Sequence, residues 1–381
     1  MTHQISKIFK EKFGTKPLIV RSPGRINIIG EHTDYNEGFV LPAAIDKAIY
    51  VAIDKRNDNL INLFAAHYNE SYEVLMDDIS PQWNWPTYVL GVVDQLQKKG
   101  FQLSGFNMVI DGDVPVGAGL SSSAAVECAV AFALNELFDL KLSKMEMVLI
   151  AQKAEQTYSG VMCGIMDMFA SMFGKKNQVI QLDCRSLEYQ YKPMVLEGYQ
   201  LVLFNTNVKH SLASSAYNER RQQCEQGVEW VKNIHPEVNS LRDISIHQLR
   251  EFVLPKDELV FTRCKFVVEE IERLQVACVD LENGNIKALG QKMFATHKGL
   301  SNDYAVSCKE LDFLVNDVIN NPAVLGSRMM GGGFGGCTIN IIETTKIDEV
   351  IETVGRNYKN EMLLEITPII VKIEDGTSII N

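Results

Sequence analysis

The segment from Pro115 to Glu127, PVGAGLSSSAAVE, has the composition of an anion-binding loop. The apolar run before it, residues 106–110, predicts a strand, and the Ala- and Leu-rich run after it, residues 124–138, predicts a buried helix. A glycine loop that opens a helix leaves backbone N–H groups unpaired at one point, where the helix dipole adds partial positive charge. Such loops most often bind phosphate. The alternative is a flexible Gly/Ser turn ahead of a core helix.

The three consecutive serines of this loop add hydroxyl groups to the backbone amides. Hydroxyl oxygens can donate to phosphate oxygens or bind Mg²⁺, a hard cation that prefers oxygen ligands. No Gly-Lys-Ser/Thr ends the loop and the G-x-G-x-x-G spacing is absent, so it is neither a Walker A loop nor a dinucleotide fingerprint. The candidate phosphate-binding residues of the loop are Gly117, Ala118, Gly119, Leu120, Ser121, Ser122, Ser123 and Ala124.

A second polar cluster occupies residues 22–42, SPGRINIIGEHTDYNEGFVLP. Its charged and imidazole side chains suit a ligand with many hydroxyl groups, because carboxylates accept from hydroxyls while imidazole can donate or accept. The alternative is a polar loop with a surface ion pair. Two isoleucines directly before Gly30 favour a segment that lines a cleft.

Four segments of the chain resemble the galactokinase family. The sequence GRINIIGEHTDYNEGFVLP resembles the galactokinase signature, and PVGAGLSSSAA resembles the phosphate loop of the wider group of sugar and mevalonate kinases. Residues 163–167, CGIMD, are similar to the segment that holds the catalytic aspartate, and residues 331–337, GGGFGGC, to the third, glycine-rich motif. The four lie in the family's order, so the resemblance covers nearly the whole chain.

The resemblance implies that Asp167 and Arg25 are the catalytic residues. Asp167 would accept or orient the hydroxyl proton, and a paired Arg25 would hold it ionised. The alternative for Asp167 is an ordinary polar residue at the start of a helix. The resemblance also implies that Glu155, on a helix predicted over 145–158, holds Mg²⁺ together with Ser123. A lone Glu on a helix otherwise lies on a solvated face.

Five residues would hold the sugar according to the same resemblance: Glu31, His32, Asp34, Gly164 and Tyr217. In the family an aromatic residue lies against adenine, and Trp85 matches it best by its spacing to Tyr88; a core or lid tryptophan is the alternative. Family members commonly have Gln, an acidic residue and Thr where this chain has Met168, Ala305 and Met330. We expect Met168 to tune the sugar pocket rather than abolish the chemistry.

The elements that must position these residues are strands and helices without strict βαβ alternation. Strands are predicted at 18–20, 43–57, 106–110, 201–204, 339–342 and 369–373, and helices at 4–13, 88–96, 124–138, 145–158, 221–234, 257–282 and 347–361. This mixture predicts an α+β chain of two domains with the active site between them. The resemblance implies an N-terminal domain like ribosomal protein S5 domain 2, residues 1–195, and a ferredoxin-like C-terminal domain, residues 196–381.

The bulk composition restricts the class of protein. The length of 381 residues is enough for two domains, and the formal net charge of −11 gives no support to nucleic acid or an anionic membrane as a partner. No run approaches the length of a spanning helix, and the N-terminus has no apolar core of secretory type. Eight cysteines without a C-x-x-C pair argue against a zinc site and suit reduced thiols. We expect a cytoplasmic monomer.

The resemblance implies a kinase that moves the γ-phosphoryl of ATP to the anomeric hydroxyl of α-D-galactose, with Mg²⁺, as the first committed step of the Leloir pathway. One alternative is a kinase for N-acetylgalactosamine, galacturonate or arabinose. Glu31 and His32 favour a sugar with a free C6 hydroxyl. The other alternative is a non-catalytic sensor of galactose and ATP. The presence of Arg25, Asp167 and Glu155 argues against the sensor.

Overall fold

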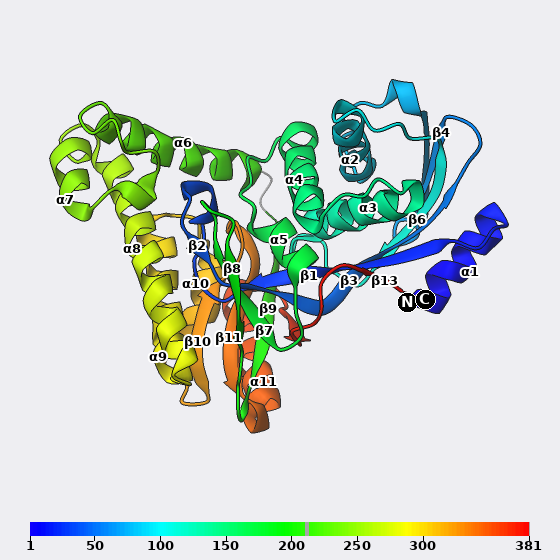
Figure 1. Cartoon of the computed structure of the whole chain (residues 1–381). Coiled ribbons are helices and arrows are strands. Elements are labelled where there is room, and N and C mark those ends of the chain that lie inside the picture. The colour runs from blue at the N-terminus through cyan, green and yellow to red at the C-terminus, as the bar shows by residue number, and fades with distance from the viewer. Residues whose placement is uncertain (210–212, 381) are drawn as a thin grey trace.

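The computed structural model of the chain describes residues 1–209 and 213–380 (Figure 1). Its N-terminal part is built on a six-stranded sheet of order β13-β1-β3-β6-β4-β5. The strands are β1 (Leu18–Asn27), β3 (Pro42–Lys55), β4 (Leu60–Ala65), β5 (Glu70–Leu75), β6 (Phe106–Gly112) and β13 (Ser378–Ile379). β4 and β6 pair in parallel and the other neighbours are antiparallel.

Helices cover both faces of this sheet. α3 (Ser122–Phe138) and α5 (Met166–Phe173) pack on β1 and β3, and α2 (Pro86–Lys98) and α4 (Lys144–Ala154) pack outside α3. α1 (Thr2–Phe13) lies on the other face, with Ile5 and Phe9 buried against Ala52. Side chains alternate along a strand, so Val51 and Ile53 of β3 belong to the main core while Ala52 faces α1.

The C-terminal part contains an antiparallel sheet of order β10-β11-β9-β12. Its strands are β9 (Tyr199–Lys209), β10 (Val324–Met329), β11 (Gly335–Glu343) and β12 (Thr367–Val371). Numbered along the chain, the order from β12 to β10 is fourth, first, third, second, which is the ferredoxin-like order that was predicted. α10 (Lys309–Val318) and α11 (Ile347–Met362) form a core with this sheet, and α9 (Ile286–Lys298) packs along β10.

A helical layer and a small sheet complete the fold. α6 (Ala213–Lys232), the short α7 (Ile246–Gln248) and the 25-residue α8 (Glu258–Glu282) form their own hydrophobic core at one side of the molecule, seen at the left of Figure 1. The third sheet joins β2 (Phe39–Val40), β7 (Gln178–Asp183) and β8 (Tyr189–Pro193). The α+β class and the two-domain arrangement are confirmed.

The predicted elements are present, and the main differences lie at their ends. α6 begins at Ala213 rather than at residue 221, and β11 begins inside the glycine motif at Gly335. The helix predicted over 145–158 ends as α4 at Ala154 and continues as a π-helical turn, Glu155–Ser159. The domain boundary at 195/196 stays a prediction. β13, at the end of the chain, pairs with β1 in the N-terminal sheet.

Two general expectations can be compared with this fold. All eight cysteines lie within the described residues and are free thiols. Across residues 1–209 and 213–380, no helix is both long and apolar enough to cross a membrane.

Candidate active site

The predicted phosphate loop leads directly into the N-terminus of α3. Gly117 and Gly119 have φ angles of 77° and 74°, a left-handed conformation that glycine adopts without strain. Ser121 is also left-handed, with φ 56° and ψ 52°, and forms the N-cap without a side-chain capping bond. The first N–H groups of α3 therefore remain available for an anion at this point.

The third glycine motif packs backbone to backbone against this loop. A Cβ added to Gly119 would lie 3.2 Å from the carbonyl oxygen of Met330, and one added to Gly336 would lie 3.3 Å from the nitrogen of Gly119. Gly333, with φ 86°, approaches Val306 so closely that a Cβ would lie 2.1 Å from its carbonyl oxygen. Gly119 and Gly336 lie where segments from the two halves of the chain meet without side chains between them, and Gly333 packs against the Val306 backbone within the C-terminal half.

Asp167 and Arg25 form a bidentate pair beside the loop. Arg25 Nε and Nη2 donate to the two carboxylate oxygens of Asp167 at 2.7 and 3.0 Å, and Nη1 donates to the carbonyl of Gly119 at 2.6 Å. The β1 ladder is irregular just before Arg25, whose N–H instead donates to the Leu120 carbonyl at 3.1 Å. Burial opposes the charge of Arg25, but Asp167 and Glu31 outweigh it and raise the pKa of its guanidinium.

The predicted sugar-binding residues converge on one cavity with this pair. The cavity, of about 160 Å³, is lined by residues from both halves of the chain, among them Arg25, Glu31, His32, Asp34, Gly164, Asp167, Tyr217 and Gly331. Asp167 lies in the first turn of α5, and Asp34 begins a short 3-10 turn that follows β1. The structure therefore brings together side chains that lie more than 180 positions apart in the sequence.

His32 is held as a neutral side chain in this cavity. Its Nδ1 bonds the Tyr35 hydroxyl at 2.8 Å, and that hydroxyl bonds the Tyr304 hydroxyl at 2.8 Å. Burial lowers the pKa of His32 to about 3. Its Nε2 is buried and has no partner among the described residues, so this nitrogen remains for a ligand hydroxyl.

Asp34 and Gly164 fit together only because Gly164 has no side chain. A Cβ at this position would lie 1.8 Å from Oδ2 of Asp34. The same oxygen accepts the N–H of Met166 at 3.4 Å. Burial, and then the charge of Asp167, raise the pKa of Asp34 to about 6. Ionisation of Asp34 is therefore unfavourable among these neighbours, and a ligand that donates hydroxyl groups would reduce its cost.

The Asp34→Asn variant is expected to be more stable than the wild type yet to bind sugar poorly. The carboxyl pKa is about 6 when folded and about 4 when unfolded, so ionisation at pH 8 disfavours the folded form. Removing the charge should raise the free energy of unfolding by about 2–3 kcal/mol at pH 8, because each pKa unit corresponds to about 1.4 kcal/mol. That gain should shrink as the pH falls from 6 to 4. Urea unfolding at pH 8 and pH 4 measures it, and an equal gain at both pH values would contradict this explanation.

Ser123 and Glu155 provide oxygen ligands suited to a divalent metal. Ser123 Oγ donates to Oε1 of Glu155 at 2.8 Å, from the first turn of α3 to the π-helical turn. Burial raises the pKa of Glu155 to about 7, so a nearby positive charge would stabilise its ionised form. Within residues 1–209 and 213–380, no three His, Cys, Asp or Glu side chains could hold a metal by themselves. A metal here would need further oxygens, such as those of nucleotide phosphates.

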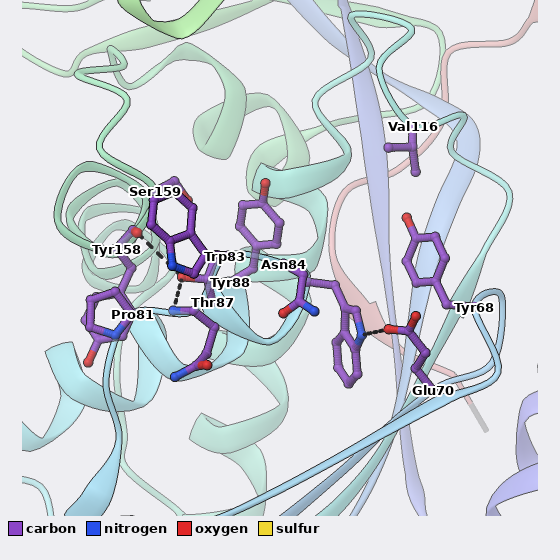
Figure 2. Close-up of a pocket in the computed structure, with 12 residues that line it drawn as sticks. Tyr68, Glu70, Pro81, Trp83, Asn84, Thr87, Tyr88, Val116, Tyr158 and Ser159 are labelled. Atoms are coloured by element: carbon purple, nitrogen blue, oxygen red, sulfur yellow. Dashed lines mark hydrogen bonds between the residues drawn. The ribbon is translucent and has the colours of Figure 1, made fainter. Parts of the chain in front are cut away.

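Trp85 lies between two cavities that adjoin the loop. The first, of about 700 Å³, is shown in Figure 2, with Tyr68 and Glu70 on one side and Tyr158 and Ser159 on the other. The second, of about 510 Å³, shares Trp85 and Tyr88 with the first and reaches Ser122 and Ser123. The Trp85 indole donates to Glu70 at 2.9 Å. Trp85 is therefore partly buried, packing against the edge of the main core and also facing these cavities, and an adenine contact stays a prediction.

Three residues have roles that the sequence interpretation did not give. Ser121 donates its hydroxyl to Asp167, so it supports the candidate base as well as the loop. Glu127 lies one turn after Ser123 on α3, fully buried, and burial followed by the charge of Glu155 raises its pKa well above the usual range. The sequence signal for Glu127 was a glutamate flanked by apolar residues within a helix, which indicates a buried carboxyl group. Arg328 forms a fully buried pair with Glu31.

The three residues that depart from the family pattern, Met168, Met330 and Ala305, lie in different parts of the structure. The expectation that Met168 tunes the sugar pocket is wrong, because Met168 is fully buried in the main core and does not line the cavity. On α5, it is Met166 and Asp167 that reach the cavity. The buried Met330 accepts the N–H of Asn27 through its sulfur at 3.4 Å. Ala305 has a left-handed φ of 49°, and its carbonyl accepts a hydrogen bond from Arg220.

Comparison with known proteins agrees with this geometry. Residues 7–55 match the model of the galactokinase galactose-binding signature, and residues 87–175 and 277–360 match the N-terminal and C-terminal domains of GHMP kinases. A galactokinase from Clostridium acetobutylicum is 38% identical over 389 aligned residues, covering 100% of this chain and 98% of that protein. A galactokinase from Thermotoga neapolitana is 39% identical, covering 94% of this chain and 98% of its own.

A solved structure is similar over the whole length. It is the galactokinase of Lactococcus lactis in complex with galactose, with a TM-score of 0.95, 32% sequence identity and full coverage of both chains. The chain belongs to the galactokinase family of the GHMP kinases.

Proposed function

We infer that this chain transfers the γ-phosphoryl of ATP to the anomeric hydroxyl of α-D-galactose, giving α-D-galactose 1-phosphate and ADP. This is the first committed step of galactose use by the Leloir pathway. The observation that supports it best is the single cavity in which the Arg25–Asp167 pair meets Glu31, His32 and Asp34. The Lactococcus relative, solved with galactose, has the same fold over its full length.

The sugar would be held by groups of complementary hydrogen-bonding type. The carboxylates of Glu31 and Asp34 accept from hydroxyl groups, and the free Nε2 of His32 adds a further polar contact. The Tyr217 side chain lines the same cavity as Gly332, and a Cβ added to Gly332 would lie 3.4 Å from the Tyr217 ring. Several carboxylates in one small cavity disfavour a sugar acid such as galacturonate, because its charge would be repelled.

Catalysis would depend on positioning and charge stabilisation rather than on a strong base. The anomeric oxygen attacks the γ-phosphorus while the bond between that phosphorus and the bridging oxygen of ADP breaks. The hydroxyl proton passes to Asp167 late in the step, since a carboxylate paired with Arg25 is a weak base. Arg25 holds Asp167 in place and offsets negative charge on the transferring group.

The nucleotide phosphates would lie at the N-terminus of α3, with the glycine motif on the other side. We propose Mg²⁺ as the metal, held by Ser123 and Glu155 together with phosphate oxygens. When bound, the ion neutralises charge on the β- and γ-phosphates. Tyr88 and Trp85 offer aromatic faces to the base. The monomeric state, the cytoplasmic location and the domain boundary at 195/196 also stay proposals.

The first experiment should measure ADP release with Mg²⁺-ATP across galactose, glucose, N-acetylgalactosamine, galacturonate and arabinose, with mass detection of the product. We expect a galactose-dependent signal that disappears on chelation of the metal and returns with Mg²⁺. Faster turnover of another sugar would keep the mechanism and change the substrate. Binding of galactose and ATP without ADP release would turn the interpretation to a sensor.

A further inference from the structure

Arg328, at the end of β10, is a fully buried arginine with every donor in use. Its Nε donates to the carbonyl of Ile28 at 2.8 Å. Nη1 donates to its neighbour's carbonyl, Met329, at 2.7 Å and to Oε1 of Glu31 at 3.1 Å. Nη2 donates to the carbonyl of Asn27 at 2.5 Å and again to Oε1 of Glu31 at 3.1 Å. These bonds use all five N–H groups of the guanidinium.

The contacts of Glu31 are divided unequally between its two carboxylate oxygens. Oε1 accepts from Nη1 and Nη2 of Arg328 and also from the N–H of Gly331 at 2.9 Å. Among the described residues Oε2 accepts no hydrogen bond, and Glu31 lines the cavity that holds Asp167. One oxygen is therefore fixed by the protein, and the other remains for a ligand hydroxyl.

A buried ion pair is an expensive way to join two segments. Desolvation of both charges offsets most of their attraction, and well-packed apolar residues often stabilise a fold as well or better. Arg328 joins the segment after β1 to the segment before the glycine motif, 297 residues away, where apolar residues would serve for packing alone. What apolar residues could not do is hold a carboxylate in one orientation.

We propose that Arg328 is a positioning residue that sets the sugar selectivity of this site through Glu31. By fixing Oε1, Arg328 presents Oε2 as an acceptor for one hydroxyl of the sugar. A sugar that lacks this hydroxyl leaves the oxygen unpaired in a desolvated cavity and is rejected. The proposal depends on the proposed function, because it requires the sugar to occupy the cavity.

The test is a scan of deoxy sugars with three variants. kcat/KM is measured for galactose and for 2-, 3-, 4- and 6-deoxygalactose, all of which keep the anomeric hydroxyl. The penalty for an analogue is the factor by which its kcat/KM lies below that of galactose. The analogue whose penalty becomes smaller in Glu31→Gln identifies the hydroxyl that Glu31 binds. We expect Arg328→Met to lower kcat/KM for galactose about 10- to 100-fold and to shrink the penalty for that same analogue. Arg328→Lys keeps the positive charge but lacks the planar guanidinium with its five N–H donors, so it should retain part of the discrimination against that deoxy sugar.

A double-variant comparison separates this role from a structural one. If Arg328 acts through Glu31, then adding Arg328→Met to the Glu31→Gln variant should lower kcat/KM for galactose only slightly further. The matched control is Arg242→Lys, because Arg242 makes a bidentate pair with Asp183 away from the cavity. This control should lower the melting temperature without changing the deoxy-sugar penalties.

Clear outcomes would overturn the proposal. It is wrong if folded Arg328 variants keep the wild-type deoxy-sugar penalties, or if their losses add fully to those of Glu31→Gln. Should Arg328→Met fail to fold, Glu31→Asp tests the same point from the other side, since shortening the carboxylate breaks its fit to Arg328. Unchanged discrimination in Glu31→Asp would then refute the proposal. Failure of the wild type to phosphorylate any sugar of the panel would instead refute the proposed function.

Discussion

The Asp167→Asn variant is expected to lose about 10²- to 10⁴-fold in kcat. Asp167 accepts two hydrogen bonds from Arg25 and one from Ser121, all from donors fixed by the fold. An amide cannot take the hydroxyl proton, and its NH₂ group would face N–H donors of Arg25. Because the sugar has several other contacts in the cavity, KM for galactose should change far less than kcat.

Steady-state kinetics with varied galactose and varied ATP would measure the changes in kcat and in KM separately. The matched control is Asp183→Asn, because Asp183 also forms a bidentate pair with an arginine, Arg242, but lies outside the cavity. The control should lose a similar amount of stability and keep its kcat. Turnover of Asp167→Asn within a factor of about ten of the wild type would remove Asp167 from the proton transfer.

The parts of the site that lie within one segment could be predicted from the sequence. The loop from Gly117 to Ser123 has its glycines where positive φ is needed, and it precedes an apolar helix, so its structure follows from local rules. The same holds for Asp34, which lies in a short polar segment between strands. The resemblance then placed Asp167 and Arg25 together, which composition and periodicity alone could not do.

The contacts between distant segments could not be predicted from local patterns. Arg328 lies in the sequence LGSRMMGGG, where an arginine is ordinarily a surface residue, and nothing nearby indicates that it is buried on Glu31. Glu270 is similar: it lies in a helix rich in charged residues, yet it is fully buried and accepts the N–H of Gly30. These pairs exist because the tertiary fold brings two halves of the chain together.

The wrong expectation for Met168 has a related cause. Consecutive residues of a helix point in directions about 100° apart, so the two neighbours of the catalytic Asp167 lie to opposite sides of it and need not both face the cavity. Met168 accordingly lies in the main core, whereas Met166 and Asp167 line the cavity. Alignment with a family motif gives the identity of a position but not the direction of its side chain.

The Arg25→Ala variant is expected to lose about 10²- to 10³-fold in kcat and also to be less stable. Arg25 is 3% exposed, and it donates to Asp167 and to the carbonyl of Gly119. Its removal leaves the Asp167 carboxylate, among the described residues, with only the Ser121 hydroxyl as donor and the Gly119 carbonyl without the arginine, which should cost about 1–3 kcal/mol of unfolding free energy. Unlike Asp167→Asn, the Arg25→Ala variant should also bind ATP more weakly, because Gly119 belongs to the phosphate loop.

Arg25→Lys separates charge from geometry. A lysine keeps one positive charge near Asp167 but cannot donate to both carboxylate oxygens and to Gly119 from one planar group. If orientation of Asp167 is what matters, Arg25→Lys should lose nearly as much kcat as Arg25→Ala while regaining much of its stability. If the positive charge alone matters, Arg25→Lys should recover most of the turnover. Arg242→Ala, which breaks the remote pair with Asp183, supplies the control for stability in both comparisons. Near wild-type kcat in Arg25→Ala would show that the guanidinium stabilises the fold without acting in phosphoryl transfer.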